Sequence, residues 1–295
     1  VAFSGFYAGA SWLIFSGSII AVAITETGLS TKVARAVLGL VGSSYASVIV
    51  TIAVVCLVLA FLLPSTAARI LLLIPIVLAL ADRLGYGPRS EGRTGIVIAT
   101  LTTSFLPCAS ILTSGNRTLV MAGLGETLYG IKFAYSDFII WNFPVLTLLV
   151  VVLISGLVVW RYREPPSTAG QPLDMEAPRD PSQKIVLGIV LCALALWATD
   201  FLHHVSPAWV GLAAVVAFLV GPTRNLALFD KARFDYWLMF VAFISLGGVI
   251  TETGLGARMG EVLVSVAGLE PGVSFAAELW NLGAISLISI GINLV

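Results

Sequence analysis

The sequence predicts an all-α polytopic membrane protein that is built as an inverted repeat. Of its 295 residues 58% are hydrophobic and 11% are charged, whereas soluble domains carry about 25% charged residues. Long apolar runs follow one another along the chain, as in membrane-spanning helices. The six residues ITETGL occur at 24–29 and again at 250–255. Their flanks also match, with WLIF before the first copy and WLMF before the second, which indicates an internal duplication.

The formal net charge is zero, which gives no sign of a nucleic-acid partner. All three cysteines, Cys56, Cys108 and Cys192, lie inside apolar runs. They therefore predict neither a disulfide framework nor a metal site. The chain begins with Val and ends within an apolar run, so we expect the sequence to be a fragment.

A helix that crosses the hydrocarbon core needs about 20 apolar residues. In chain order, the predicted spans lie at 8–24, 46–63, 67–81, 95–112 continuing through 119–128, 138–160, 185–202, 208–220, 236–250 and 273–295. Two shorter amphipathic segments, 30–41 and 256–267, each follow a copy of TETGL. Helices of that kind tend to lie along the membrane surface.

The polar, proline-rich stretch 161–184 predicts a linker, extended or disordered, between two halves. The predicted organisation is a first inverted repeat at 1–160, this linker, and the start of a second repeat at 185–295. The first repeat contains a re-entrant hairpin at 46–81 and a broken helix at 95–128. The second repeat is expected to be truncated within its own hairpin.

The basic residues sort to one side of the membrane when each span crosses once and the hairpin returns to its own side. That side collects Lys32, Arg35, Arg83, Arg89, Arg93, Arg161, Arg163, Arg179, Lys184, Arg224, Lys231 and Arg233. The other side holds Lys132 and Arg258. The positive-inside rule makes the first side, with the linker, cytoplasmic. The two copies of TETGL then lie on opposite sides of the membrane, as expected for an inverted repeat.

The first candidate for chemistry is LLPSTAARILLLIPI at 62–76. Pro64 cannot continue the incoming helix, and Ser65 is a good N-cap for the outgoing one. A break at membrane depth offers carbonyls to a cation and a helix N-terminus to an anion. Arg69 lies one turn further, and an arginine at that depth is a functional candidate. The alternative is an ordinary turn outside the membrane, with Arg69 at the surface.

The second candidate is FLPCASILTSGNRTLVMAG at 105–123, where polar residues separate two apolar halves. Pro107 and Gly115 disfavour a continuous helix. The pattern predicts a discontinuous helix with a polar midpoint. The alternative is a plain loop with Arg117 in solvent.

Two further groups of titratable residues give weaker hypotheses. Asp200, His203 and His204 lie close together and could form a metal cluster, or they could be solvated at the membrane interface. Glu26 and Glu252, in the repeated motif, are expected to be helix-end carboxylates next to C-capping glycines. A proton-relay role for these two glutamates is the alternative.

These stretches together resemble the divalent anion:sodium symporter family, whose members are di- or tricarboxylate and sulfate permeases of the larger ion transporter superfamily. The resemblance covers nearly the whole chain. The segment FSGFYAGASWLIFSGSIIAVAITETGL is similar to the family's first-repeat segment, and LLPSTAARILLLIPI is similar to its hairpin. The segment GNRTLVMAGLGETLYGIKFAYSDFIIWNFPVL is similar to its broken helix and the span that follows. The chain departs from the family's S-N-T hairpin motif, since Ser65, Thr66 and Ala67 stand there.

The resemblance implies an elevator-type secondary transporter, not an enzyme, that forms a homodimer in the inner or plasma membrane. Its cargo would be a small divalent or trivalent anion, carried by sodium symport or by anion exchange, with no cofactor besides the coupling sodium ion. The implied binding residues are Ser65, Thr66, Ala67, Arg69, Thr113, Ser114, Gly115, Asn116, Arg117 and Thr118. Sodium would bind at Ser65, Thr66, Ser114 and Gly115.

Other functions remain open on the sequence. Within the superfamily, the alternatives are a sodium/proton antiporter and an arsenite or metalloid exporter. An alternative of another class is a membrane-embedded metal hydrolase built on Asp200, His203 and His204.

Overall fold

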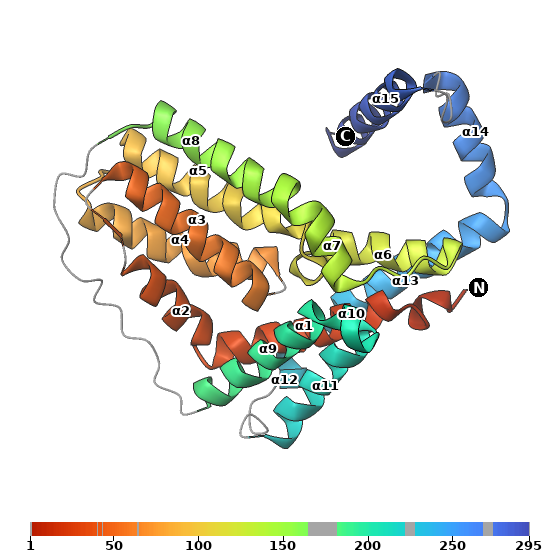
Figure 1. Ribbon diagram of the computed structural model, residues 1–295, viewed down its shortest axis with the longest axis horizontal. Coiled ribbons are helices and arrows are strands. Elements are labelled where there is room, and N and C mark those ends of the chain that lie inside the picture. The colour runs from red at the N-terminus through yellow and green to blue at the C-terminus, as the bar shows by residue number, and fades with distance from the viewer. Residues whose placement is uncertain are drawn as a thin grey trace.

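A computed structural model describes residues 2–294 apart from 40, 43, 64, 165–181, 222–227 and 268–273. The described part of the chain consists of helices and connecting segments and holds no strand (Figure 1). Its α-helices are α1 (Gly9–Glu26), α2 (Leu29–Leu38), α3 (Tyr45–Leu62), α4 (Thr66–Arg83), α5 (Glu91–Phe105), α6 (Asn116–Tyr129), α7 (Tyr135–Asn142), α8 (Val150–Arg161), α9 (Gln183–Ala198), α10 (Asp200–His203), α11 (Pro207–Val220), α12 (Leu228–Lys231), α13 (Phe234–Glu252), α14 (Leu255–Ala267) and α15 (Phe275–Leu294). A π-helical stretch, Phe143–Leu149, joins α7 to α8.

The helices form two groups that meet along α1 and α6. In one group α3, α4, α5 and α8 pack against one another, and in the other α1 packs against α9, α11 and α13. Helix α2 bridges the groups, since it contacts α1, α3, α4 and α9. Helices α14 and α15 extend away from both groups (Figure 1). The apolar core runs through both groups.

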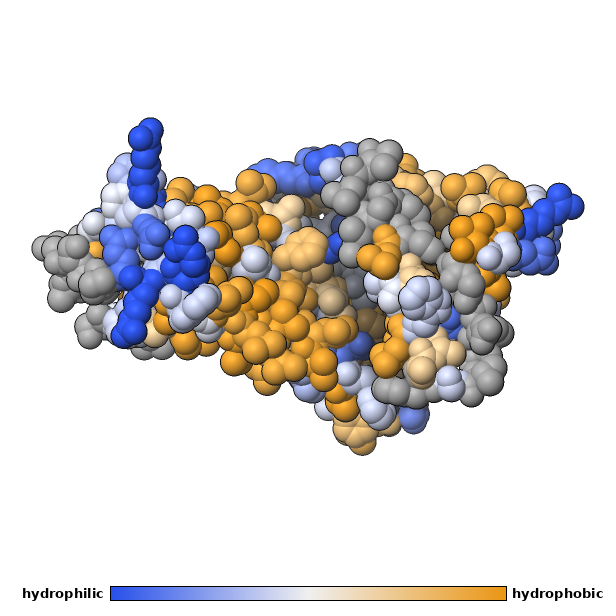
Figure 2. Space-filling view, turned by 90° about the horizontal axis from the view of Figure 1, so that it is seen from above, coloured by the Kyte–Doolittle hydropathy of each residue, from blue (hydrophilic) through white to orange (hydrophobic). Residues whose placement is uncertain are grey.

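Four helical segments in the described part are long and apolar enough to cross a membrane: Gly9–Glu26, Tyr45–Leu62, Tyr135–Arg161 and Phe234–Glu252. Helices α9 and α11 are apolar but shorter. Large apolar side chains, such as Trp141 and Leu153, are exposed on these segments. Figure 2 shows a broad hydrophobic zone across the middle of the molecule. An exposed apolar surface of this size is expected to contact lipid. The predicted all-α polytopic membrane fold is confirmed.

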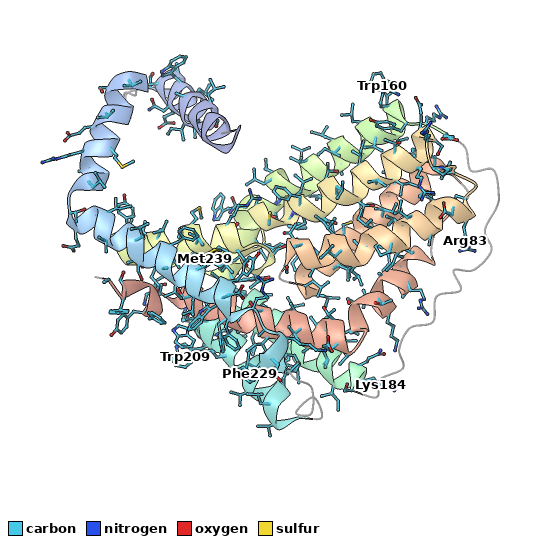
Figure 3. The ribbon with its side chains drawn as sticks, turned by 180° about the vertical axis from the view of Figure 1, so that it is seen from behind. Arg83, Trp160, Lys184, Trp209, Phe229 and Met239 are labelled. Carbon is cyan, nitrogen blue, oxygen red and sulfur yellow. The ribbon has the colours of Figure 1, made fainter. Side chains whose placement is uncertain are left out.

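Polar residues gather where α4 and α8 end, near Arg83 and Trp160 (Figure 3). At that end Arg161 on α8 pairs with Glu91 at the start of α5, with 3.3 Å between the charged atoms. The end of α8 therefore shares one polar face with the end of α4 and the start of α5, which lie about 70 residues earlier in the sequence. The predicted linker at 161–184 leaves from this face, and its central part, 165–181, lies outside the described residues.

The two copies of TETGL fold alike. In each copy the helix ends at the glutamate and the threonine that follows is its C-cap. Gly28 (φ 67°) and Gly254 (φ 70°) then adopt the left-handed conformation that favours glycine. The Gly28 amide donates to the Thr25 carbonyl at 3.0 Å, and the Gly254 amide donates to Thr251 at 3.0 Å. The amphipathic helices α2 and α14 begin immediately afterwards, so both short helices predicted from the sequence are confirmed.

Helices α1 and α13, which carry the two copies, run in opposite directions (Figure 1). The Gly5 amide, just before α1, donates to the Ser245 hydroxyl in the middle of α13 at 2.9 Å. Glu26, at the other end of α1, pairs with Lys231 just before α13 begins. The inverted-repeat prediction requires this antiparallel relation.

The tryptophans that open the matching WLIF and WLMF segments touch each other. The ring centroids of Trp12 and Trp237 are 5.6 Å apart. Phe15 lies edge-on to Trp237, with 5.4 Å between centroids. Corresponding positions of the two copies therefore meet at the crossing of α1 and α13.

Candidate functional site

The predicted break in the hairpin is present between α3 and α4. Helix α3 ends at Leu62, and Leu63 is extended. The Ser65 hydroxyl accepts a hydrogen bond from the Ala68 amide at 3.3 Å, so Ser65 is the N-cap of α4. This arrangement confirms the expected interruption of the apolar stretch, although Pro64 lies outside the described residues.

The predicted discontinuous helix is also present. After α5 ends at Phe105, two short 3-10 turns, Leu106–Ala109 and Leu112–Ser114, lead to α6. Gly115 precedes α6 in an extended conformation. A Cβ atom at this glycine would lie 2.3 Å from Cys108 Cβ, so a side chain does not fit there.

Arg69 joins the hairpin to the broken helix. Its guanidinium is fully buried and donates to three backbone carbonyls: Leu63 at 2.5 Å, Ser104 at 2.9 Å and Ser114 at 3.4 Å. It also donates to the Thr66 hydroxyl at 3.1 Å. The alternative of a surface Arg69 is wrong, because the side chain has no exposed area.

A pocket of about 440 Å³ lies where the two breaks face α1, α12 and α13. Its lining includes four of the predicted binding residues, Ser65, Ala67, Thr113 and Asn116, and one glutamate of the repeated motif, Glu26. Ser65 caps α4 and Asn116 opens α6, so the N-terminal turns of two helices reach the pocket. Helix N-termini carry partial positive charge and free amides, and both favour an anion.

The other predicted binding residues do not line the pocket: Thr66, Arg69, Ser114, Gly115, Arg117 and Thr118. The Thr66 hydroxyl donates to the Ser114 carbonyl at 3.4 Å. Arg117 stacks on Phe105, with its guanidinium carbon 4.5 Å from the ring centroid. The Thr118 hydroxyl donates to the backbone of the first 3-10 turn. Arg117 is exposed on the far side of the broken helix, so it does not line this pocket.

Two cations that were not predicted as site residues also line the pocket. Lys231 and Arg233 lie at its edge, just before α13. Lys231 pairs with Glu26 at the end of α1. Arg233 pairs with Asp235 at 2.7 Å. Their position before the second WLMF segment, on the side richest in basic residues, was the sequence signal that could have found them.

Asp200 has a structural partner. Its carboxylate accepts hydrogen bonds from the amides of Tyr135 and Ser136 and so caps α7 from a distant segment. His203 uses both ring nitrogens, one with the Leu196 carbonyl at 2.8 Å and one with a backbone amide at 3.0 Å. Within the described residues no group of three His, Cys, Asp or Glu side chains could hold a metal ion. The metal-cluster alternative is therefore wrong.

A second pocket, of about 410 Å³, lies on the other side of the broken helix. Its titratable lining includes Glu126, whose carboxylate accepts from the Gly9 amide at 2.8 Å and caps α1. Leu13 and Leu119 line both pockets, so they form the wall between them.

The amino-acid sequence is similar to those of known membrane proteins. A family model described as "Citrate transporter" matches residues 1–293. A "Membrane protein" of Cupriavidus necator is 25% identical over 282 residues, covering 91% of this chain and 54% of that protein. "Dicarboxylate transporter 2, chloroplastic" of Spinacia oleracea is 24% identical, covering 88% of this chain and 48% of that protein. "L-tartrate/succinate antiporter" of Escherichia coli K12 is 24% identical, covering 92% and 58%. The chain spans about half the length of these relatives.

Proposed function

The chain belongs to the citrate transporter family, which confirms the resemblance to divalent-anion transporters, and on that premise we propose that it forms part of a secondary active transporter of di- or tricarboxylates. The family identifies a membrane transporter and not an enzyme. Two curated relatives are named for dicarboxylate and for tartrate and succinate transport. Because the chain spans about half of those relatives, their activity is carried over here as a proposal.

The observation that carries the proposal is the pocket at the two helix breaks. The first turns of α4 and α6 both line it, and Lys231 and Arg233 stand at its edge. A small carboxylate would find free amides and hydroxyl or amide donors at one end and cations at the other. A doubly charged anion can interact with both ends of this pocket at once, whereas a neutral solute gains little from the cations.

Each proposed contact follows from the lining. Ser65 and Asn116 donate to the carboxylate, Thr113 completes the wall, and Ala67 leaves room where a larger side chain would intrude. Lys231 exchanges its partner Glu26 for the anion as the anion enters. The residues behind the pocket, Thr66 among them, hold the two breaks in register.

The proposed setting is a cell membrane, inner or plasma, with the linker at 161–184 in the cytoplasm. Movement of the group formed by α3, α4, α5 and α8 past the group around α1 would carry the pocket across, as in an elevator. A homodimer would hold the second group still. Coupling is by sodium symport or by anion exchange.

The experiment is uptake of labelled succinate, citrate and sulfate into proteoliposomes that contain the full protein. Uptake of one of them, driven by sodium or by an internal anion, supports the proposal and names the substrate class. Failure of all three with folded, inserted protein contradicts it. A pH-gradient assay and an arsenite assay then test the sodium/proton antiporter and metalloid exporter.

The variants Ser65→Ala and Asn116→Ala test the site itself. Each variant removes one hydrogen-bond donor to the charged ligand, and with it the ordering that this donor gives the ligand. We expect uptake to fall at least about tenfold, since hydrogen bonds to charged groups contribute roughly 1.5–3 kcal/mol. Ser155→Ala is the matched control, because Ser155 is buried in α8 and does not line the pocket. Unchanged kinetics in both site variants would rule out the assignment.

A further inference from the structure

A buried aspartate ties the two helix groups together at the start of α7. Helix α7 continues through the π-helical stretch into α8, so it belongs with α3, α4 and α5. Asp200 begins α10, which packs against α9 in the group around α1. It is 5% exposed, and its carboxylate accepts from the amides of Tyr135 and Ser136, at 3.3 Å for Ser136. The Ser136 hydroxyl donates to the same carboxylate. An acidic side chain of the α1 group therefore caps a helix of the other group.

A second carboxylate makes the same kind of contact in the opposite direction. The first turn of α6 lines the anion pocket together with that of α4, so α6 must travel with α4 if the pocket moves. Near the end of α6, Glu126 accepts from the amide of Gly9, the first residue of α1, at 2.8 Å. A carboxylate at a helix N-terminus is stabilised by free amides and by the helix dipole. Each group thus caps a helix of the other, and we name Glu126 and Asp200 the cap pair.

The cap pair is placed where its hydrogen bonds can break and form again. The pocket of about 410 Å³ is lined by both carboxylates and by Gly9. If a cap separated inside a dry core, a carboxylate and its amides would lose their partners, at a high cost in free energy. Water in the adjoining pocket can bind these groups instead. Opening of the caps is therefore less costly here than it would be in the apolar core.

The apolar surfaces at this boundary can slide, whereas the caps cannot. Leu13 of α1 and Leu119 of α6 form the wall between the two pockets. Tyr135 stacks on Trp197 of α9, with 5.4 Å between ring centroids. Apolar contacts are not directional, so they change gradually as one surface moves over the other. A displacement of one helical turn, about 5.4 Å, takes the carboxylates of the cap pair out of hydrogen-bond range of their amides.

We propose that the cap pair is a lock, which holds the two helix groups in the conformation described here and opens each time the anion pocket crosses the membrane. The inference rests on the proposed function, because the movement is that of the proposed transport cycle. Glu126 and Asp200 are positioning residues, since neither lines the anion pocket. Loss of the lock therefore shifts the balance between two conformations and leaves the contacts with the anion unchanged.

Spin labels on the two groups measure this balance without transport. Trp160 in α8 and Lys184 in α9 are exposed, and each lies at the end of its span away from the caps. Trp160→Cys and Lys184→Cys are labelled in the full protein without its other cysteines, and pulsed electron paramagnetic resonance gives the distance distribution. Glu126→Gln with Asp200→Asn keeps the shape of both side chains and removes both charges. Each lost charge should change the ratio of the two populations about threefold or more. The double variant should therefore raise the second population about tenfold.

Asp137→Asn is the matched control for the loss of a carboxylate. Asp137 is exposed, lines the same pocket and lies in the first turn of α7. Within the described residues its carboxylate caps no helix of the other group, so this variant should keep the wild-type distances. A double variant with the distances of this control overturns the inference, even if its Tm is lowered, since caps that only stabilise the fold give that result. If the double variant does not fold, Glu126→Gln and Asp200→Asn are measured singly, and each should give about a threefold change.

A reversible cross-link tests whether the lock has to open. Ser136→Cys with Asp200→Cys replaces the contact between the groups by a disulfide, formed with copper phenanthroline. The oxidised protein should bind labelled succinate but not transport it, and dithiothreitol should restore uptake. Ser136→Cys alone is the control, which oxidation should leave active.

Two results of this experiment contradict the lock. Uptake by the fully oxidised protein at the rate of the reduced protein overturns the inference, and failure of the disulfide to form contradicts the contact on which it depends. If the wild type transports no anion at all, the proposed function fails. The distance measurement then still decides whether the cap pair holds the two groups together.

Discussion

Gly115 has less room for a Cβ atom than the other described glycines of the broken helix, Gly123 and Gly125. An added Cβ would lie 2.3 Å from Cys108 Cβ and 3.3 Å from Cys108 Cα, so the two 3-10 turns would have to move apart. Overpacking of this kind costs roughly 1–3 kcal/mol. We therefore expect Gly115→Ala to lower Tm by about 2–10 °C in a thermal melt.

The control for this substitution is Gly156→Ala. No atom lies within 4 Å of a Cβ added at Gly156, which is inside α8. Alanine is better than glycine in a helix interior by up to about 1 kcal/mol. The control should therefore be neutral or slightly stabilising. If Gly115→Ala melts like the control, the close contact with Cys108 does not exist in solution.

At the level of single residues, the sequence predicted donors better than acceptors. Ser65 and Asn116, which line the pocket, were predicted because the residue type alone identifies a side chain that can cap a helix or bind an anion. Leu63 and Ser104 were not predicted as partners of Arg69, because they act through backbone carbonyls, which every residue has. Their convergence comes from tertiary packing alone. Lys231 and Arg233 were missed for a related reason, since the crossing of α1 and α13 brings them to the pocket.

The TETGL turn depends on its glycine in both copies. Gly28 and Gly254 hold φ angles of 67° and 70°, and nothing lies within 4 Å of a Cβ added at Gly254. Strain in the left-handed region, about 1–2 kcal/mol for alanine, is therefore the only penalty expected at Gly254. Gly254→Ala should lower Tm by a few degrees.

Gly254→Asn separates strain from bulk. Asparagine tolerates the left-handed conformation better than alanine does. The asparagine variant should therefore melt above the alanine variant, although it is larger. The reverse order would contradict the left-handed turn.

Tyr86, between α4 and α5, gives the polar end of the bundle a dependence on pH. Its hydroxyl donates to the Glu164 carbonyl at 2.8 Å. Burial, together with the Glu164 carboxylate, raises the pKa of Tyr86 from 10.0 to about 12. The folded state therefore holds the phenolic proton more tightly than the unfolded state. The stability that this group contributes is full below about pH 10 and is lost as pH rises towards 12.

Comparing the wild type with Tyr86→Phe isolates this contribution. Phenylalanine has no proton to lose, so the difference in Tm between the two proteins should shrink as pH rises from about 10 to 12. Every other titratable group is present in both proteins, so its contribution cancels in the comparison. A difference in Tm that stays constant over this range would contradict the raised pKa.

Helices were easier to predict than their ends. The breaks at both candidate segments came from Pro, Ser and Gly, whose backbone chemistry is local. The caps of α1 and α7 could not be predicted, because Glu126 and Asp200 reach them from distant segments. The span predicted at 138–160 is observed as Tyr135–Arg161. It contains a π-helical stretch, Phe143–Leu149, a change of hydrogen-bond pattern that leaves no periodic signal in so apolar a run.

The antiparallel crossing of α1 and α13 can be tested on the whole molecule. Cysteine is placed at an exposed basic position in a background free of Cys56, Cys108 and Cys192. An inverted repeat predicts that Lys32→Cys and Lys231→Cys react with a membrane-impermeant reagent from the cytoplasmic side. Lys132→Cys and Arg258→Cys should react from the opposite side. Labelling of all four from one side would contradict the inverted arrangement.

The contact between Trp12 and Trp237 bears on how such a chain arose. In a two-fold symmetric pair, a residue that touches its own counterpart lies at the axis. These tryptophans occupy matching places in the duplicated segments, and their ring centroids are 5.6 Å apart. An inverted duplication would therefore descend from a single-copy ancestor that met a second copy of itself through this tryptophan, with the two molecules inserted in opposite orientations. Fusion would have made permanent, in one polypeptide, an association that depended on two separate insertions.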